Sequence, residues 1–169
     1  MSGVADILSR PADEFVNDPT IEQLWTIKAI EAMKIHYNLL CSVPPNQLRL
    51  TKKDDLIYKR FREEFPDIKV DKIDEDLMKS DQGKAKWRPF CEEFKDEVAD
   101  YNFASLLRID ANNDYDNENT IIAPRIQFLA IEIARNREGC NDQLYNCNCK
   151  RVNESASQKV TESDEQKCD

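Results

Sequence analysis

The sequence has little of what many catalytic sites need. Its 169 residues include one histidine, His36, and three glycines. Sites built from several histidines are therefore excluded, and the sequence contains no Gly-x-Ser-x-Gly elbow, Gly-x-Gly-x-x-Gly turn or Walker loop. We interpret His36, which lies in an apolar helical pattern, as a hydrogen-bonded structural residue. We expect no enzymatic activity, no catalytic residue and no cofactor.

Long hydrophobic runs are also absent. No stretch of about 18 uncharged apolar residues occurs, so we expect no membrane-spanning segment. Residues 1–15 contain Asp6, Asp13 and Glu14 and lack the apolar core of a signal peptide. The net charge of −9 argues against direct nucleic-acid binding, because that affinity comes from Lys and Arg on phosphates. These features predict a soluble monomer in the cytoplasm, with the nucleus as a second compartment.

The six cysteines form no recognisable metal or disulfide pattern. No Cys-x-x-Cys pair occurs, and no histidine lies near Cys140, Cys147 and Cys149. We interpret these three as exposed free thiols. Cys41 and Cys91 lie in apolar helical patterns and are predicted to be small buried hydrophobes. This usage indicates a reducing compartment.

Prolines and capping residues predict where the first helices begin and end. Asp18 and Pro19 favour a helix start, and Pro44-Pro45 ends that segment. Apolar residues occur on most faces between them, which is typical of a helix central to a core. A second helix is predicted to open with Thr51 as its cap and to close at Pro66. Its buried face consists of Ile57, Phe61 and Phe65.

The second half of the chain is predicted to contain further helices. Pro89 would start or kink a helix whose buried face carries Phe90, Phe94, Val98 and Tyr101. The last helix is predicted to run from Ile121 to Glu138, with a core stripe of Ile122, Ile126, Leu129 and Ile133. The run from residue 106 to residue 109 is too short to assign to a strand or a helix.

Together these patterns predict an all-α protein, a single compact bundle of about five to six helices. We predict a flexible N-terminus over residues 1–14, a helical domain over residues 15–145 and a disordered polar tail over residues 146–169. The tail is rich in Ser, Glu, Gln and Lys, and it cannot bury enough apolar surface to offset its ordering entropy.

One acidic loop resembles the start of a calcium site, with oxygen-bearing residues at Asp110, Asn112, Asp114, Asp116 and Glu118. The pattern then fails, because the sixth position is Tyr115 rather than glycine and the twelfth is Ile121 rather than glutamate. We interpret the segment as a solvated loop and expect no metal.

The predicted last helix carries polar residues near one side. Spacing alone favours an internal ion pair of Glu132 with Arg135, and the alternative is a recognition stripe for a partner. Arg88 raises a similar choice, because Arg and Trp are frequent at interface hot spots, whereas aromatics beside a proline usually pack in a core. The polar residues concerned in the predicted last helix are Arg125, Glu132, Arg135, Asn136 and Arg137.

Several longer runs carry a family resemblance. They are Asn17 through Trp25, Leu50 through Tyr58, Lys86 through Cys91, and most strongly Glu118 through Phe128 and Ala130 through Gly139. These runs resemble the eukaryotic family named polysaccharide biosynthesis domain-containing protein 1. The resemblance covers roughly residues 15–145 in order, without large gaps, and stops beyond Cys140.

The resemblance implies a mainly helical fold and a dedicated chaperone of translation elongation factor 1-alpha. Such a chaperone engages the GTP-binding domain of the nascent factor at the ribosome and releases it once that domain folds and binds GTP. The implied partners are the nascent factor, the ribosome and nascent-chain-associated factors. The candidate partner-binding residues are polar positions inside the matching runs: Arg88, Arg125, Glu132, Arg135, Asn136 and Arg137. Two alternatives stay open: a glycan-biosynthesis or methyltransferase-like enzyme, as the family name suggests, and an interaction module with another client.

Overall fold

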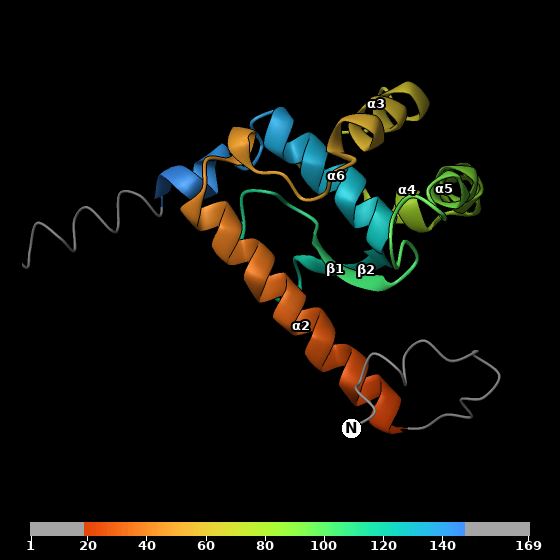
Figure 1. Cartoon of the computed structure of the whole chain (residues 1–169), viewed down its shortest axis with the longest axis horizontal. Coiled ribbons are helices and arrows are strands. Elements are labelled where there is room, and N and C mark those ends of the chain that lie inside the picture. The colour runs from red at the N-terminus through yellow and green to blue at the C-terminus, as the bar shows by residue number, and fades with distance from the viewer. Residues whose placement is uncertain (1–18, 148–169) are drawn as a thin grey trace, which may run out of the picture.

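The computed structural model describes residues 19–147, with side chains from residue 22 onward (Figure 1). The protein is mainly helical. Its elements in chain order are α2 (Pro19–Ser42), the 3₁₀ helix η2 (Pro45–Gln47), α3 (Asp54–Glu64), α4 (Glu75–Lys79), α5 (Asp81–Glu93), β1 (Ala104–Arg108), β2 (Thr120–Pro124) and α6 (Arg125–Arg137). Residues 142–147 are also helical. The predicted flexible segment 1–14 and all but the first two residues of the predicted tail 146–169 lie outside the described residues; those two, 146 and 147, are helical.

Helix α2 has the predicted length but not the predicted place. It runs from Pro19 to Ser42 and ends just before the paired prolines, as expected. The prediction that it is central to the core is wrong: Ile27 is 55% exposed and Ile35 is 62% exposed. In Figure 1 its first turns extend beyond the other elements. A helix that is apolar nearly all round, but packed on one side, keeps apolar residues at the surface.

A two-stranded antiparallel sheet corrects the all-α prediction. The ladder runs from Ala104 opposite Pro124 to Arg108 opposite Thr120. The segment that the sequence left unassigned is thus extended. The predicted last helix also loses its first residues to β2, and α6 begins directly after Pro124. Cross-strand pairing of β-branched residues outweighs the helical spacing of the apolar residues in this short segment.

The starts of α3 and α5 also differ from their predictions. Lys53, not Thr51, is the N-cap of α3, while the Asp54 carboxylate accepts hydrogen bonds from the backbone N–H groups of Leu50 and Thr51. Pro89 lies inside α5, so the predicted start at that residue is wrong. Helix α5 begins at Asp81, after an N-cap serine whose hydroxyl accepts from the third residue of the helix.

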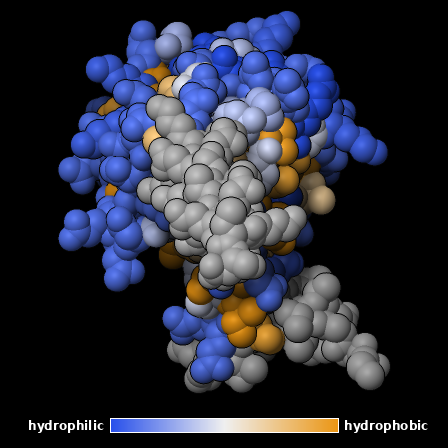
Figure 2. All heavy atoms as spheres, turned by 90° about the vertical axis from the view of Figure 1, so that its left-hand side faces the viewer, coloured by the Kyte–Doolittle hydropathy of each residue, from blue (hydrophilic) through white to orange (hydrophobic). Residues whose placement is uncertain are grey.

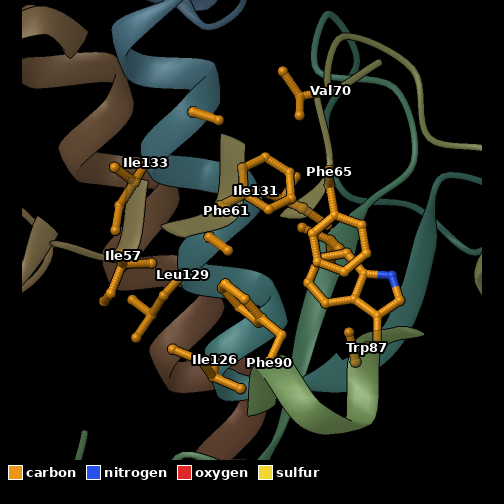
Figure 3. Packing of buried hydrophobic residues seen from close by; sticks show 14 of the residues in the cluster. Ile57, Phe61, Phe65, Val70, Trp87, Phe90, Ile126, Leu129, Ile131 and Ile133 are labelled. Carbon is orange, nitrogen blue, oxygen red and sulfur yellow. The ribbon is translucent and has the colours of Figure 1, made fainter. Parts of the chain in front are cut away.

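The hydrophobic core lies between α3, α5, α6 and the sheet. Figure 3 shows the rings of Phe61, Phe65, Trp87 and Phe90 packed together beside apolar residues of α6. The ring centroids of Phe65 and Trp87 are 4.2 Å apart in a stacked arrangement. The predicted buried face of α3 is confirmed, and Phe90 and Phe94 are buried as expected. Tyr101 is only half-buried, and α5 ends at Glu93, well before it. This core holds α6 and the sheet in place relative to each other.

Candidate functional site

The structure separates the candidate partner-binding residues into two groups. Glu132, Arg135 and Asn136 are buried within α6, where the folded protein cannot present them to a partner. Arg88 and Arg137 are exposed, and Arg125 is half-buried. The polar residues of α6 therefore do not form one continuous recognition stripe.

The buried group belongs to a charged cluster formed by Arg108, Glu132, Arg135 and Asn141, all 0% exposed. The Glu132 carboxylate accepts hydrogen bonds from Arg135 Nη1 at 2.7 Å and from Arg108 Nη2 at 3.2 and 3.3 Å. Asn141 Nδ2 donates to it at 3.1 Å. The predicted ion pair of Glu132 with Arg135 is confirmed, and it lies in the interior of the fold.

The charged cluster joins α6 to distant parts of the chain. Arg135 Nε donates to the Val70 carbonyl at 2.6 Å, and its Nη2 donates to the carbonyls of Arg108 and Ile109 at 2.9 and 3.0 Å. Arg108 Nη1 donates to the Ala111 carbonyl at 2.8 Å. Buried charges are tolerated when they are paired and hydrogen-bonded in this way, so the cluster acts as a structural clamp.

The pKa values of Glu132 and His36 are both lowered in the folded protein, so Glu132 is ionised and His36 neutral at neutral pH. Burial alone would raise the pKa of Glu132, but Arg108 and Arg135 outweigh it and hold that pKa far below its usual range. Burial lowers the pKa of His36; Glu132 opposes this shift, and both arginines reinforce it. The His36 Nε2 atom lies 3.8 Å from Glu132, and neither ring nitrogen has a hydrogen-bond partner within the described part of the chain. The predicted hydrogen bond of His36 is therefore wrong, and its ring packs edge-on against Phe128.

The acidic loop between the strands is organised by an amide side chain. Asn119 Oδ1 accepts from the Asp110 backbone N–H at 2.7 Å, and Asn119 Nδ2 donates to the carbonyls of Asp110 and Asp114. Asp116 accepts from the backbone N–H groups of Glu118 and Asn119. Over residues 19–147 no group of His, Cys, Asp or Glu side chains is arranged to hold a metal ion.

The described cysteines do not assemble into a site. Cys41 and Cys91 are half-buried, where full burial was predicted. Burial raises the pKa of Cys91 to about 11, which keeps its thiol protonated and unreactive. Cys147 is exposed as predicted, Cys140 is half-buried, and Cys149 lies outside the described residues.

A groove of about 290 Å³, here called the α2 groove, separates α2 from the sheet and the start of α6. On the α2 wall, lining residues recur three or four positions apart along one helix face: Lys28, Ala32, Ile35 and Leu39. The opposite wall includes Phe103, Leu106, Arg125 and Phe128. The groove therefore brings together apolar side chains from two sides and basic groups from both.

Few contacts hold the two walls of the α2 groove together. Trp25 Nε1 donates to the Ala104 carbonyl at 3.1 Å, and the rings of His36 and Phe128 meet edge to face at 5.0 Å. Ile35, at 62% exposed, and Leu39, at 39% exposed, lie on its α2 wall. Figure 2 shows further hydrophobic residues (orange) on the narrow lower part of the molecule, where the N-terminal half of α2 lies, so this patch is distinct from the groove residues Ile35 and Leu39. Exposed apolar residues on one wall of a groove make it a candidate binding surface.

A larger cleft, of about 470 Å³, lies beside α4. Its aromatic floor, formed by Phe65 and Trp87, is buried within the core. Lys69, Lys72 and Lys86 at this cleft are accompanied by Asp67 and Asp74. Of the large hydrophobic residues that are exposed in the described part of the chain, this cleft contains Leu77 alone. The α2 groove offers more exposed apolar surface and is the stronger candidate for a binding site.

The exposed candidate residues have different surroundings. Arg125, the first residue of α6, lines the α2 groove. Arg137 Nη2 donates to Asp55 at 2.5 Å, and its guanidinium lies over the Tyr58 ring at 4.9 Å. Arg88 is exposed on α5, away from the groove lining. Only Arg125 is thus placed at the candidate site.

Sequence reasoning missed the apolar residues of the α2 groove. Ile35, Leu39 and Phe128 were not among the candidates, because an apolar residue in a helix is usually assigned to the core. The available signal was the apolar residues on most faces of α2. One helix packed on one side cannot bury them all, so a second apolar face remains for a partner.

The fold and the groove define a mainly helical protein with a buried charged cluster and a partly apolar groove at its surface. No helix in the described part of the chain has the length and apolarity needed to cross a membrane. Residues 21–146 match the sequence profile of the family described as PBDC1 protein. The chain belongs to the PBDC1 family, which confirms the resemblance drawn from the sequence.

Relatives from animals and fungi are similar over most of the chain. Protein PBDC1 of Homo sapiens is 50% identical over 84% of this chain and 61% of its own length, so the chain matches less than two thirds of that protein. The PBDC1 homolog of Schizosaccharomyces pombe is 45% identical over 79% of this chain and 93% of its own length. The solution NMR structure of protein yst0336 from Saccharomyces cerevisiae is 40% identical, with a TM-score of 0.72, over 80% of this chain and 97% of that one.

Proposed function

We propose that the chain is a dedicated chaperone that binds the GTP-binding domain of nascent translation elongation factor 1-alpha in the cytoplasm. The observation that carries the proposal is the α2 groove, where Ile35 and Leu39 face Phe103 and Phe128 across an open surface. A chaperone needs such exposed apolar surface to shield the apolar surface of an unfinished client. Membership of the PBDC1 family supports the choice of client through the resemblance described above.

Charge favours the same assignment. The chain has a net charge of −9, and the proposed client is a basic nucleotide-binding domain. Opposite net charges speed the encounter of two proteins and disfavour other acidic partners. The ribosome and nascent-chain-associated factors are expected nearby because the client is captured during synthesis. The chain acts as a monomer and needs no cofactor or catalytic step.

Release depends on the state of the client. GTP stabilises the folded conformation of its binding domain, and the chaperone has to bind that conformation more weakly than the nucleotide-free one. Only this difference in affinity can drive release, because a ligand shifts an equilibrium no further than its differential affinity allows. ATP hydrolysis by the chain is not required.

Titration calorimetry of the purified chain against the nucleotide-free GTP-binding domain tests the proposal. We expect saturable binding that weakens at least tenfold when GTP is present, a difference of about 1.4 kcal/mol. Equal affinity with and without GTP would remove the release mechanism, and no binding in either state would remove the proposed client. A parallel titration with S-adenosylmethionine and nucleotide sugars tests the enzymatic alternative, and saturable binding there would overturn the proposal.

A further inference from the structure

We infer that the α2 groove takes an apolar segment that carries an acidic side chain, and that Arg125 and Lys28 pair with that carboxylate. The inference rests on the proposed chaperone function. It names the chemistry of the client segment that enters the groove and the residues that recognise it.

Arg125 is the first observation. Its side chain lines the α2 groove, its Nε atom is buried without a hydrogen-bond acceptor, and it forms no ion pair with any residue whose side chain is described. By contrast, Arg62 and Arg137 are paired, with Glu138 and Asp55 respectively. A buried Nε–H group without an acceptor is costly, and a carboxylate that enters the groove beside it would remove that cost.

Lys28 is the second observation. Its Nζ lies 4.8 Å from the centroid of the Phe103 ring, and within residues 22–147 it has no carboxylate partner. Asp100 is the acidic residue in the groove lining, so the two basic side chains leave the groove with a local positive charge. The N-terminus of α6, where Arg125 lies, adds partial positive charge from the helix dipole. Although the chain has a net charge of −9, the groove itself is locally positive. It is therefore complementary to an acidic segment, not to a basic one.

The apolar part of the groove sets the rest of the segment. Ile35, Leu39 and Phe128 provide contact area along its length, which fits the apolar face of a short helix or strand. A segment that is only apolar would leave Arg125 unpaired and bind less tightly. The groove therefore selects for an apolar face and a carboxylate together.

Calorimetry with the full chain and the nucleotide-free client domain tests the inference. We expect Arg125→Glu and Ile35→Asp each to weaken binding at least tenfold, because they remove a charge partner and an apolar anchor. The matched controls are Arg88→Glu, at an exposed arginine outside the groove lining, and Ile27→Asp, at an exposed apolar residue of α2 outside that lining. Both controls are expected to bind like the native chain.

A peptide array of the client domain identifies the carboxylate. Segments retained by the native chain are expected to contain Asp or Glu beside apolar residues, and replacing that acid by Lys should restore binding to Arg125→Glu.

If the native chain binds the client and the groove variants bind equally well, the inference is overturned while the proposed function stands. If the native chain does not bind the client, both are overturned. Should Arg125→Glu unfold, Arg125→Met replaces it in the calorimetry, and unchanged binding by that variant would overturn the inference.

Discussion

The two ends of α6 present similar residue types in opposite surroundings. At its first residue, Arg125 lies in a surface groove without an ionic partner in the described part of the chain. Three turns along, Arg135 makes hydrogen bonds to Glu132 and to three backbone carbonyls, with no exposed surface. The difference shows that a polar residue pattern on a helix does not by itself mark a surface. What surrounds each residue decides whether it stabilises the fold or remains available to a partner.

The largest expected effect on stability is at Glu132, in the charged cluster. Glu132→Gln keeps the side-chain size but removes the charge that Arg108 and Arg135 share, leaving two buried guanidinium groups without a counter-ion. We expect a loss of about 3–5 kcal/mol in the free energy of unfolding. Urea unfolding followed by circular dichroism measures it, and a loss below about 1 kcal/mol would show that the charged cluster is not a clamp.

The pH dependence of stability is the next largest effect. His36 and Glu132 both have pKa values lowered in the folded protein, from ordinary values of 6.5 and 4.5, so the unfolded chain binds more protons below each value. The free energy of unfolding therefore has its full value above about pH 6.5 and decreases as the pH is lowered. Protonation of His36 in the unfolded chain causes the first decrease and protonation of Glu132 the second. Each group lowers the free energy of unfolding by up to about 1.4 kcal/mol per pH unit.

Urea midpoints of the native chain and His36→Gln between pH 7 and pH 5 isolate the first step. The native chain is expected to lose stability over this range, while the variant stays nearly flat until the carboxyl groups begin to titrate. Parallel curves for the two proteins would contradict the assignment of this step to His36.

A smaller effect is expected at the C-cap of the same helix, just beyond the charged cluster. Glu138, at the C-cap of α6, accepts two hydrogen bonds of 2.7 Å from Arg62, and both side chains are partly exposed. Because solvent screens such pairs, Glu138→Gln should cost no more than about 1 kcal/mol of unfolding free energy. Glu132→Gln and Glu138→Gln thus compare the same substitution at a buried and at a partly exposed ion pair. Equal losses of unfolding free energy would show that burial does not determine the strength of these pairs.

The smallest effect on stability is expected at Arg125. Arg125→Met removes a charge that has no carboxylate partner among the described side chains and keeps an apolar stem of similar length. We expect the urea midpoint to stay the same or to rise slightly, whereas Arg135→Met should lower it strongly. A marked loss for Arg125→Met would indicate that this residue clamps the fold as Arg135 does.

Helix extent and local side-chain pairs were predicted from the sequence better than contacts between distant segments. The extent of α2, the buried face of α3 and the ion pair of Glu132 with Arg135 follow from spacing and capping, which are local properties. The sheet was missed because its pairing joins segments whose partners are not neighbours in the sequence. The partner of Glu132 from β1, Arg108, was missed for the same reason, since nothing local links the two.

The α2 groove could be predicted only in part. Its basic residue Arg125 was found through the family resemblance, because it lies in a matching run. The apolar wall was not found, since Ile35 and Leu39 have the same sequence pattern as buried residues of the same helix. Whether an apolar helix face packs inside or stays at the surface depends on how many elements surround it, and composition does not encode that number.

Amide hydrogen exchange of the chain, alone and with the nucleotide-free GTP-binding domain of elongation factor 1-alpha, tests most directly whether the α2 groove holds the client. We expect slower exchange in residues 28–39 of α2 and in residues 103–106. We expect no change in residues 130–137 of α6, because the charged cluster there is already buried and hydrogen-bonded without the client. Protection that leaves the groove residues unchanged and appears elsewhere would contradict the account.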